Sequence, residues 1–188
     1  MDKIKELYSA EQISKRIAEL GAEISRDYRD LECPVVIGVL KGSFCFLADL
    51  VRQIKLPESM QIEFVHLSSY GSGTASSGIV QALYLSLPNI KNRHILIVED
   101  IVDSGRTATF FREYLKDQFM PASLKLVALL DKTVHRISPV KPDYVGFSVG
   151  DVFIVGYGFD YAEEYLNQAQ RYRELPYLGA LVDGANNL

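Results

Sequence analysis

Hydrophobic and polar positions along the chain follow two alternating patterns. Short runs of branched apolar residues, at 34–40 and 94–98, have the length and composition of buried strands. Between such runs, apolar residues recur at every third or fourth position, which predicts amphipathic helices. Strands that alternate with helices are typical of an α/β fold with a mostly parallel, twisted sheet and helices on both of its faces.

Two helices are predicted in the first third of the chain. The sequence SAEQ at 9–12 has the spacing of a capping box, and the apolar positions after it predict a helix over about residues 10–29. The strand at 34–40 leads through the tight turn KGS into a second helix, whose apolar face carries Leu47, Leu50, Val51 and Ile54.

The rest of the chain predicts one more helix and several strands. A Ser/Gly-rich loop occupies residues 68–78. A helix follows the strand at 94–98 and carries Phe111, Tyr114 and Leu115. The remaining apolar runs predict strands at 61–67, 79–87, 123–130, 143–149 and 153–159.

Length and composition indicate one domain. A chain of 188 residues, 48% hydrophobic, is long enough for one well-buried core and short for two ordinary domains. We expect a single domain over residues 1–188 with its core at about 34–150. The N-terminal segment lacks the apolar region of a secretion signal, and no apolar run approaches the roughly 18 residues of a membrane span. The two cysteines, Cys33 and Cys45, show no ligand spacing and suggest small core residues in a reducing, cytoplasmic environment.

The charge balance narrows the class of ligand. A net charge of -4 argues against a nucleic-acid surface, because binding to a phosphate backbone draws on clustered Lys and Arg. A small anionic ligand is compatible with this charge, since it needs only a local site.

Candidate chemistry is concentrated in the segment HILIVEDIVDSGRTATFF at 94–111. Three carboxylates, Glu99, Asp100 and Asp103, follow the apolar run, where an α/β sheet gathers its ligands. The turn into the next helix offers backbone N–H groups and the positive end of a helix dipole, which favour a phosphate. That turn consists of Ser104, Gly105, Arg106 and Thr107.

Carboxylates beside a phosphate cradle repel the phosphate unless a hydroxylic or cationic group lies between them. A ribose with a Mg²⁺-bound diphosphate supplies both, so the acidic side chains can hold sugar hydroxyls. Taken alone, the same acidic residues are equally well explained as solvated loop residues or as a helix N-cap.

The complete pattern resembles the phosphoribosyl-diphosphate motif of the type I phosphoribosyltransferases. Further segments, from about Val35 to Leu178, resemble the hypoxanthine-guanine phosphoribosyltransferases of that family. The resemblance implies the type I fold with a small purine-binding hood made from the N- and C-terminal segments. It also implies purine salvage: Mg²⁺-dependent transfer of the phosphoribosyl group from phosphoribosyl diphosphate to N9 of a 6-oxopurine, hypoxanthine or guanine.

The resemblance assigns the diphosphate end of the site to two loops. VLKGSFCFLADL is similar to the family's first loop, which implies that Lys41, Gly42 and Ser43 meet the diphosphate and that a non-proline cis peptide precedes the lysine. SSYGSG is similar to the family's mobile loop, which implies that Ser69 and Tyr70 close over the reacting centre.

The purine end is assigned by two further segments. LVALLDK ends at Lys132, which the resemblance implies donates a hydrogen bond to the purine 6-oxo group. In VFIVGYGFDY, the resemblance places Phe153 over the base, the Ile154 backbone at its edge and Asp160 at the Mg²⁺, with Glu99 and Asp100 as further candidate metal ligands. By periodicity alone, Phe153 is a core aromatic residue and Lys132 a solvated one.

The chain departs from the family after Asp160, because AEEYLNQAQ precedes RYRELPYLG. The context YRELPY makes Arg173 the candidate for the arginine that contacts diphosphate, with Arg171 as the fallback. An insertion of this size can extend a helix, shift the arginine or remove it from the site. The three histidines, His66, His94 and His135, show no ligand spacing and are interpreted as strand-edge or surface residues.

The implied mechanism gives Asp103 the role of base toward purine N7, while Glu99 and Asp100 hold the ribose. One alternative is a regulator on the same fold that binds nucleotide or phosphoribosyl diphosphate without turnover. Another is an unrelated Mg²⁺-dependent phosphotransfer or receiver-type domain, which would want a carboxylate where this chain has Leu40 and Lys41. The sequence leaves open the choice among hypoxanthine, guanine and xanthine. Relatives imply a homodimer or homotetramer.

Overall fold

The computed structural model describes residues 3–70, 79–159 and 172–182, and the side chains at 68–70 and 79–82 are excluded from this description. The helices are α1 (Ala10–Asp27), α2 (Phe44–Gln53) and α3 (Arg106–Phe119). The strands are β1 (Lys3–Tyr8), β2 (Val35–Leu40), β3 (Gln61–Tyr70), β4 (Ile79–Tyr84), β5 (His94–Val102), β6 (Ser123–Lys132), β7 (Tyr144–Val149), β8 (Ile154–Val155) and β9 (Leu178–Val182).

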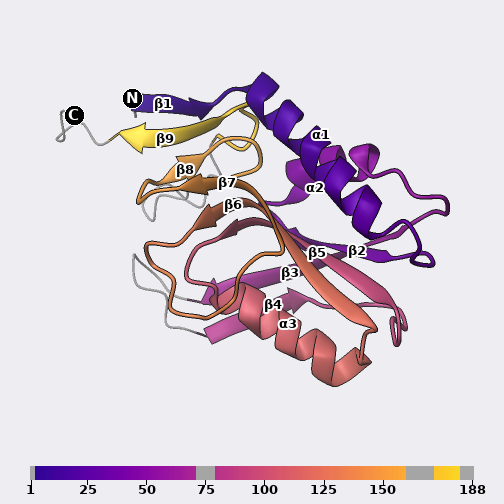
Figure 1. Cartoon of the computed structure of the whole chain (residues 1–188). Helices are drawn as coiled ribbons and strands as arrows, with labels where there is room; N and C mark the ends of the chain where they lie inside the picture. Colours follow the sequence, from indigo (N-terminus) through magenta and orange to yellow (C-terminus); the bar gives the residue numbers. More distant parts are fainter. Residues whose placement is uncertain (1–2, 71–78, 160–171, 183–188) are drawn as a thin grey trace.

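The larger sheet has six strands in the order β4-β3-β2-β5-β6-β7 (Figure 1). All neighbouring pairs are parallel except β3 and β4, so the predicted mostly parallel sheet is confirmed. β5 lies in the middle of the sheet and is buried from Ile95 to Glu99. A strand covered on both faces has no polar side to alternate with, and it therefore reads as a continuous apolar run.

Helices cover both faces of this sheet, as predicted. Leu96 and Val98 of β5 pack in the core cluster that contains the apolar faces of α1 and α2. Ile95 and Ile97 point the other way and pack in the cluster that contains α3. Figure 1 shows α3 on the side of the sheet opposite α1 and α2.

The ends of α1 show how closely local signals fix a helix. The predicted capping box is present, with Ser9 as N-cap and reciprocal hydrogen bonds between Ser9 and Gln12. The helix ends at Asp27, two residues before the predicted end. Tyr28 is the C-cap, and its buried hydroxyl donates a hydrogen bond to the Ile95 carbonyl at 3.3 Å.

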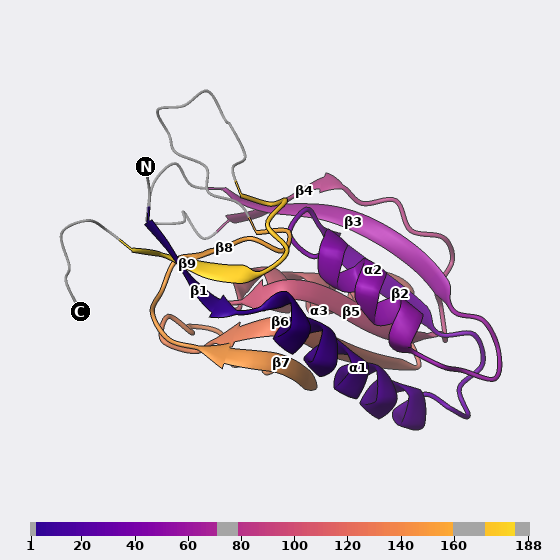
Figure 2. The same cartoon turned by 90° about the horizontal axis from the view of Figure 1, so that it is seen from above.

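A second sheet, in the order β1-β9-β8, joins the N-terminal strand to the C-terminal part of the chain. Figure 2 shows this small sheet at the end of the large sheet toward which the β6 and β7 arrows point. β1 and β9 were not predicted, because half of β1 is exposed and none of it is fully buried, and because β9 has only five residues.

Several strand predictions differ from the structure in extent. β5 continues to Val102, four residues beyond its predicted end, so Glu99 and Asp100 lie within the strand. The strand predicted at 153–159 is limited to β8, because the backbone turns through positive φ at Gly156, Tyr157 and Gly158. The strand predicted at 79–87 ends at Tyr84, and β3 continues to Tyr70, three residues into the predicted loop. Within the described ranges, no helix is long and apolar enough to cross a membrane.

Candidate functional site

Three loops meet at the carboxyl edge of the large sheet. β2, β5 and β6 are adjacent and parallel, so the segments that follow them leave the sheet on the same side. The register pairs Val102 with Asp131, which makes Asp103 and Lys132 the next residues along neighbouring strands. Residues far apart in the sequence are thereby brought to one place.

The loop after β2 begins with a cis peptide between Leu40 and Lys41, as the family resemblance implied. The Asp100 carboxylate lies against Gly42 and occupies the space that a Cβ on this residue would fill. Only glycine fits this approach. Lys41 is exposed, whereas Ser43 is fully buried and its hydroxyl donates to the Val39 carbonyl at 2.6 Å. Ser43 therefore offers a ligand only its main chain.

The end of β5 holds two carboxylates of different character. Glu99 is 4% exposed, and its Oε1 has no hydrogen-bond partner among the described residues. Burial, and then the charge of Asp100, raise the pKa of the Glu99 carboxyl well above its usual range. Asp100 is half-buried, and its Oδ1 accepts a hydrogen bond from the Ile101 N–H at 2.8 Å. A buried oxygen without a partner is costly and is typical of a site that a ligand completes.

The turn after Asp103 opens the N-terminus of α3. Gly105 is the N-cap with φ of 82°, a left-handed conformation that favours glycine, and no side chain caps the helix. A Cβ there would approach Val140 to 2.7 Å. Within the first turn, the Arg106 N–H donates to the Ser104 hydroxyl at 3.4 Å, and the end of the helix dipole favours an anion at the other backbone N–H groups. Ser104, Arg106 and Thr107 are all half-buried beside it.

Asp103 and Lys132 face each other across the β5–β6 boundary. Lys132 Nζ lies 3.9 Å from Asp103 Oδ2 and 3.1 Å from Asp151 Oδ1, and it donates to the Val152 carbonyl at 3.3 Å. The Lys132 residue is 8% exposed, so the solvated interpretation from periodicity alone was wrong. The Asp103 side chain is 40% exposed, but its Oδ1 is buried and has no hydrogen-bond partner in the described part of the chain.

Arg136, which sequence reasoning missed, holds the Asp103 loop. Its guanidinium donates to the carbonyls of Val102, Asp103 and Val140 at 2.6, 2.7 and 2.7 Å. It also pairs with the Asp131 carboxylate. Most of these partners are main-chain oxygens, which leave no trace in the sequence.

His135 lies at the site as well. Its Nδ1 is 3.6 Å from Asp103 Oδ1, and its Nε2 is 3.4 Å from Asp151 Oδ2. The side chain is 53% exposed, so the interpretation as a surface residue agrees with its exposure. Nothing in the sequence indicated that the imidazole lies between the carboxylates of Asp103 and Asp151.

The segment after β7 carries the predicted purine residues. Phe153 follows Val152, whose carbonyl accepts from Lys132, and its side chain is an exposed one at 53%. The interpretation of Phe153 as a core aromatic residue was therefore wrong. Ile154 is buried in the core, and it pairs with Ala180 of β9.

Arg173 lies beside the loop after β2 despite the insertion before it. Its guanidinium donates to the Gly158 carbonyl, and the Gly158 N–H donates to the Arg173 carbonyl at 3.0 Å. Gly158 itself packs against the main-chain oxygen of Gly42. Burial, and then the charge of Asp49, raise the pKa of the Cys45 thiol near the start of α2, and the charge of Arg173 opposes this rise.

Several sequence predictions fall at or beyond the edge of the described structure. Asp160 and Arg171 lie outside the described residues. Ser69 and Tyr70 form the last two positions of β3, paired with β4, and their side chains are outside the description.

The described residues contain no group of three or more His, Cys, Asp or Glu side chains arranged to hold a metal ion. Mg²⁺ is usually bound by one or two carboxylates together with substrate phosphates, so it does not require such a group. Asp100 and the unpartnered Oε1 of Glu99 fit this mode by donor type. Glu99 would have to ionise to act, against the direction in which burial shifts its pKa.

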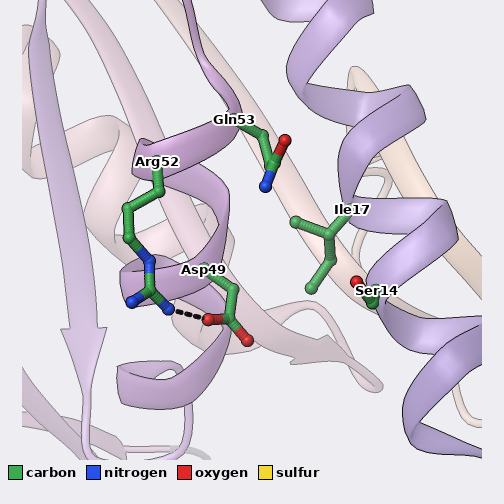
Figure 3. A pocket seen from close by; sticks show the side chains of 5 residues that line it. All are labelled: Ser14, Ile17, Asp49, Arg52 and Gln53. Atoms are coloured by element: carbon green, nitrogen blue, oxygen red, sulfur yellow. Dashed lines mark hydrogen bonds and ion pairs between the residues drawn. The ribbon is translucent and has the colours of Figure 1, made fainter.

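A groove between α1 and α2 is separate from these loops (Figure 3). It is lined by Ser14 and Ile17 of α1 and by Asp49, Arg52 and Gln53 of α2. Asp49 pairs with Arg52 and accepts a hydrogen bond from the Tyr157 hydroxyl. Asp49 therefore has two partners within the chain, and none of the residues that line the groove belongs to the Asp103 site.

Comparison with known proteins identifies similar chains along most of the sequence. The family described as "Phosphoribosyl transferase domain" matches residues 3–162. Hypoxanthine-guanine phosphoribosyltransferase from Bacillus subtilis (strain 168) is 45% identical over 177 residues, which are 94% of this chain and 92% of that protein. Hypoxanthine phosphoribosyltransferase from Haemophilus influenzae is 44% identical over 178 residues, covering 94% of each protein. The crystal structure of a hypoxanthine-guanine phosphoribosyltransferase from Bacillus anthracis has a TM-score of 0.83 at 43% identity, and the match covers 96% of this chain and 100% of that chain.

Proposed function

Because the chain belongs to the hypoxanthine-guanine phosphoribosyltransferases, within the type I phosphoribosyltransferase family, we propose that it acts in purine salvage. It transfers the 5-phosphoribosyl group of phosphoribosyl diphosphate to N9 of hypoxanthine or guanine and releases diphosphate. The observation that carries this proposal is the convergence of Asp103 and Lys132, 3.9 Å apart at the carboxyl edge of the sheet.

This pair matches the edge of a 6-oxopurine. The 6-oxo group and N7 are neighbours on that edge. A buried lysine donates to the oxo group, and the adjacent carboxylate of Asp103 accepts the proton that N7 carries in the free base or stabilises positive charge there as the bond to N9 forms. Adenine presents an amino group in place of the oxygen, so Lys132 would face a donor. The pair therefore selects 6-oxopurines, while exposed Phe153 supplies a surface for the base to stack on.

The phosphoribosyl group lies over the end of β5. Glu99 and Asp100 accept hydrogen bonds from the ribose hydroxyls and favour the positive charge that develops on the sugar as diphosphate leaves. The uncapped turn of Ser104, Gly105, Arg106 and Thr107 receives the 5′-phosphate through its backbone N–H groups.

The diphosphate lies between the loop after β2 and the C-terminal segment. Exposed Lys41, with the main chain of Gly42 and Ser43, binds it from one side. Arg173 binds it from the other, because the contact between Gly158 and Gly42 brings Arg173 to this loop. Ser69 and Tyr70, at the end of β3, begin the segment that closes over the site and keeps water from the reacting sugar.

Mg²⁺ is the proposed cofactor, and it would neutralise the diphosphate as a hard, oxygen-ligated cation. Asp100, Glu99 and Asp160 are the proposed protein ligands, Asp160 through water. The chain's part is to keep these carboxylates beside the ribose. Asp100 is fixed by its contact with Gly42 and by the Ile101 N–H.

We propose a single catalytic domain that functions in the cytoplasm as a homodimer or homotetramer. The free thiols of Cys33 and Cys45 suit a reducing compartment, although both are half-buried rather than core residues. An apolar surface for self-association is supplied by the exposed residues Ile62, Phe64, Leu83 and Tyr84. A regulator without turnover is not favoured, because Asp103 and Lys132 are both in place. No nucleic-acid or membrane partner is proposed.

The test is product formation by the purified protein with phosphoribosyl diphosphate, Mg²⁺ and one base at a time: hypoxanthine, guanine, xanthine, adenine or uracil. We expect turnover of 6-oxopurines and none of adenine or uracil. Asp103→Asn, run in parallel, should lower kcat by about 10²-fold or more, because the amide cannot accept the N7 proton. Binding of phosphoribosyl diphosphate without turnover of any base would support the regulator instead.

A further inference from the structure

We propose that His135 is a positioning residue for Asp103, an inference that rests on the function proposed above. The imidazole bridges two carboxylates from different loops. Its Nδ1 lies 3.6 Å from Asp103 Oδ1, and its Nε2 lies 3.4 Å from Asp151 Oδ2. Asp103 follows β5, and Asp151 precedes the exposed Phe153.

The need for such a residue comes from Asp103 itself. Its Oδ1 is buried and lacks a hydrogen-bond partner within the described ranges. A carboxylate that takes a proton from a substrate must present one oxygen in a fixed direction, and a partner on the other oxygen supplies that constraint. His135 is a basic side chain that faces this second oxygen.

Lys132 cannot supply this constraint once purine is bound, because each of its three N–H donors then has another acceptor. An ammonium group has three N–H donors. One is directed to Asp151 at 3.1 Å and one to the Val152 carbonyl at 3.3 Å. The purine 6-oxo group takes the third. Asp103, at 3.9 Å, is then left without a Lys132 donor, and the imidazole remains for Asp103.

The charged groups around the imidazole are two carboxylates and two cations. His135 faces Asp103 and Asp151, Lys132 lies between the same two carboxylates, and neighbouring Arg136 is engaged with Asp131 and main-chain oxygens. The pKa of Asp151 is lowered first by its hydrogen bond with Lys132 and also by the charge of His135. A protonated imidazole has a donor for each carboxylate, whereas a neutral one has a single donor for both.

Two amide variants separate the two halves of the bridge. In His135→Asn the amide lies near the position of Nδ1, so a donor toward Asp103 is kept. In His135→Gln it lies near the position of Nε2, so a donor toward Asp151 is kept. The readout is the single-turnover rate of transfer to hypoxanthine, with enzyme in excess over phosphoribosyl diphosphate, together with KM for hypoxanthine.

We expect His135→Asn to stay within about twofold of the wild-type rate, and His135→Gln and His135→Ala to be about fivefold slower with a smaller change in KM. Thermal melting of each variant confirms that the fold is kept.

His94→Asn is the matched control. His94 lies at the opposite end of β5, where its Nδ1 is 2.8 Å from Ser123 Oγ, and this variant should react at the wild-type rate. The inference is overturned if Asn is as slow as Gln and Ala, or if all three variants keep the full rate. A folded wild-type protein that turns over no base would instead overturn the proposed function, and this inference with it.

Discussion

Two pairs of a carboxylate and a cation, Asp103–Lys132 and Asp49–Arg52, look alike as charges and differ in their surroundings. In the groove between α1 and α2, the Arg52 side chain is 70% exposed, and Asp49 also accepts from Tyr157. At the carboxyl edge of the sheet, the Lys132 side chain is 10% exposed and Asp103 keeps a buried oxygen without a hydrogen bond. The Asp49–Arg52 pair is exposed to solvent, and Asp49 has a further partner in the chain. In the Asp103–Lys132 pair, one carboxylate oxygen has no hydrogen-bond partner among the described residues.

This difference shows which property marks a candidate site. Exposed ion pairs contribute little and are common on protein surfaces. Buried polar atoms left without a partner are rare, because their desolvation is not compensated. Asp103 Oδ1 and Glu99 Oε1 are the two such side-chain atoms found in the described part of the chain; Glu99 lies in β5 and Asp103 directly follows it. Incompleteness locates the site better than charge does.

The largest effect on stability is expected from Arg136→Met. Methionine keeps much of the apolar stem but leaves the carbonyls of Val102, Asp103 and Val140 and the Asp131 carboxylate without their donor. We expect the free energy of unfolding to fall by about 3 kcal/mol, measured by urea denaturation. Arg136→Lys should recover only part of this loss, because an ammonium lacks the planar fork of five donors. A full recovery would mean that charge alone holds the loop.

Lys132→Met tests the Asp103–Lys132 pair at the carboxyl edge of the sheet. Loss of a charged donor to the purine oxo group should lower kcat/KM for hypoxanthine by about 30-fold, equivalent to about 2 kcal/mol. The preference for hypoxanthine over adenine should fall as well. Steady-state kinetics with both bases measures each change, and an unchanged preference would remove Lys132 from base recognition.

Glu99→Gln tests the cost of the buried carboxylate, in protein free of Mg²⁺ and substrate. The folded-state pKa of Glu99 is raised, so the folded protein holds this proton more tightly than the unfolded chain does. Its contribution to stability is therefore present at low pH and is lost as the pH rises above about 4.5, the usual value for the side chain.

Glutamine does not titrate, so the stability of Glu99→Gln relative to the wild type should increase with pH above that value, by on the order of 1 kcal/mol. Urea denaturation at a series of pH values gives the two curves. If the two curves are parallel, burial does not raise the pKa of the Glu99 carboxyl.

The smallest effect is expected from Arg52→Met in the groove. Removal of this exposed partner of Asp49 should change the free energy of unfolding by less than about 0.5 kcal/mol and leave phosphoribosyl transfer unaffected. Activity assays and urea denaturation of this variant also provide the baseline for Arg136→Met and Lys132→Met. A large loss of activity would show that the groove takes part in the reaction.

The sequence predicted the central strands well because burial on both faces makes β2, β5 and β6 continuous apolar runs. It missed β1, where the adjacent polar residues Lys5 and Glu6 break the alternation of a half-buried strand, and β9, which is too short to show a period. These two strands pair with each other across nearly the whole length of the chain. No local pattern contains that pairing.

In the candidate site, too, some residues could be identified from local sequence and others could not. The acidic segment and Lys132 were identified through motifs, and the parallel register brings them together. Arg136 and His135 were missed because their partners are main-chain carbonyls or carboxylates at distant positions. Phe153 was misread by periodicity because an exposed aromatic residue and a core aromatic residue fit the same pattern.

The pairing between Gly158 and Arg173 has a consequence for protein engineering. Gly158 and Arg173 exchange hydrogen bonds, and the Tyr157 N–H donates to the Leu175 carbonyl at 2.8 Å. Both ends of the intervening chain are thus fastened before and after the insertion. A change in the number of residues between Asp160 and Arg171 is therefore expected to leave Arg173 in its position beside Gly42.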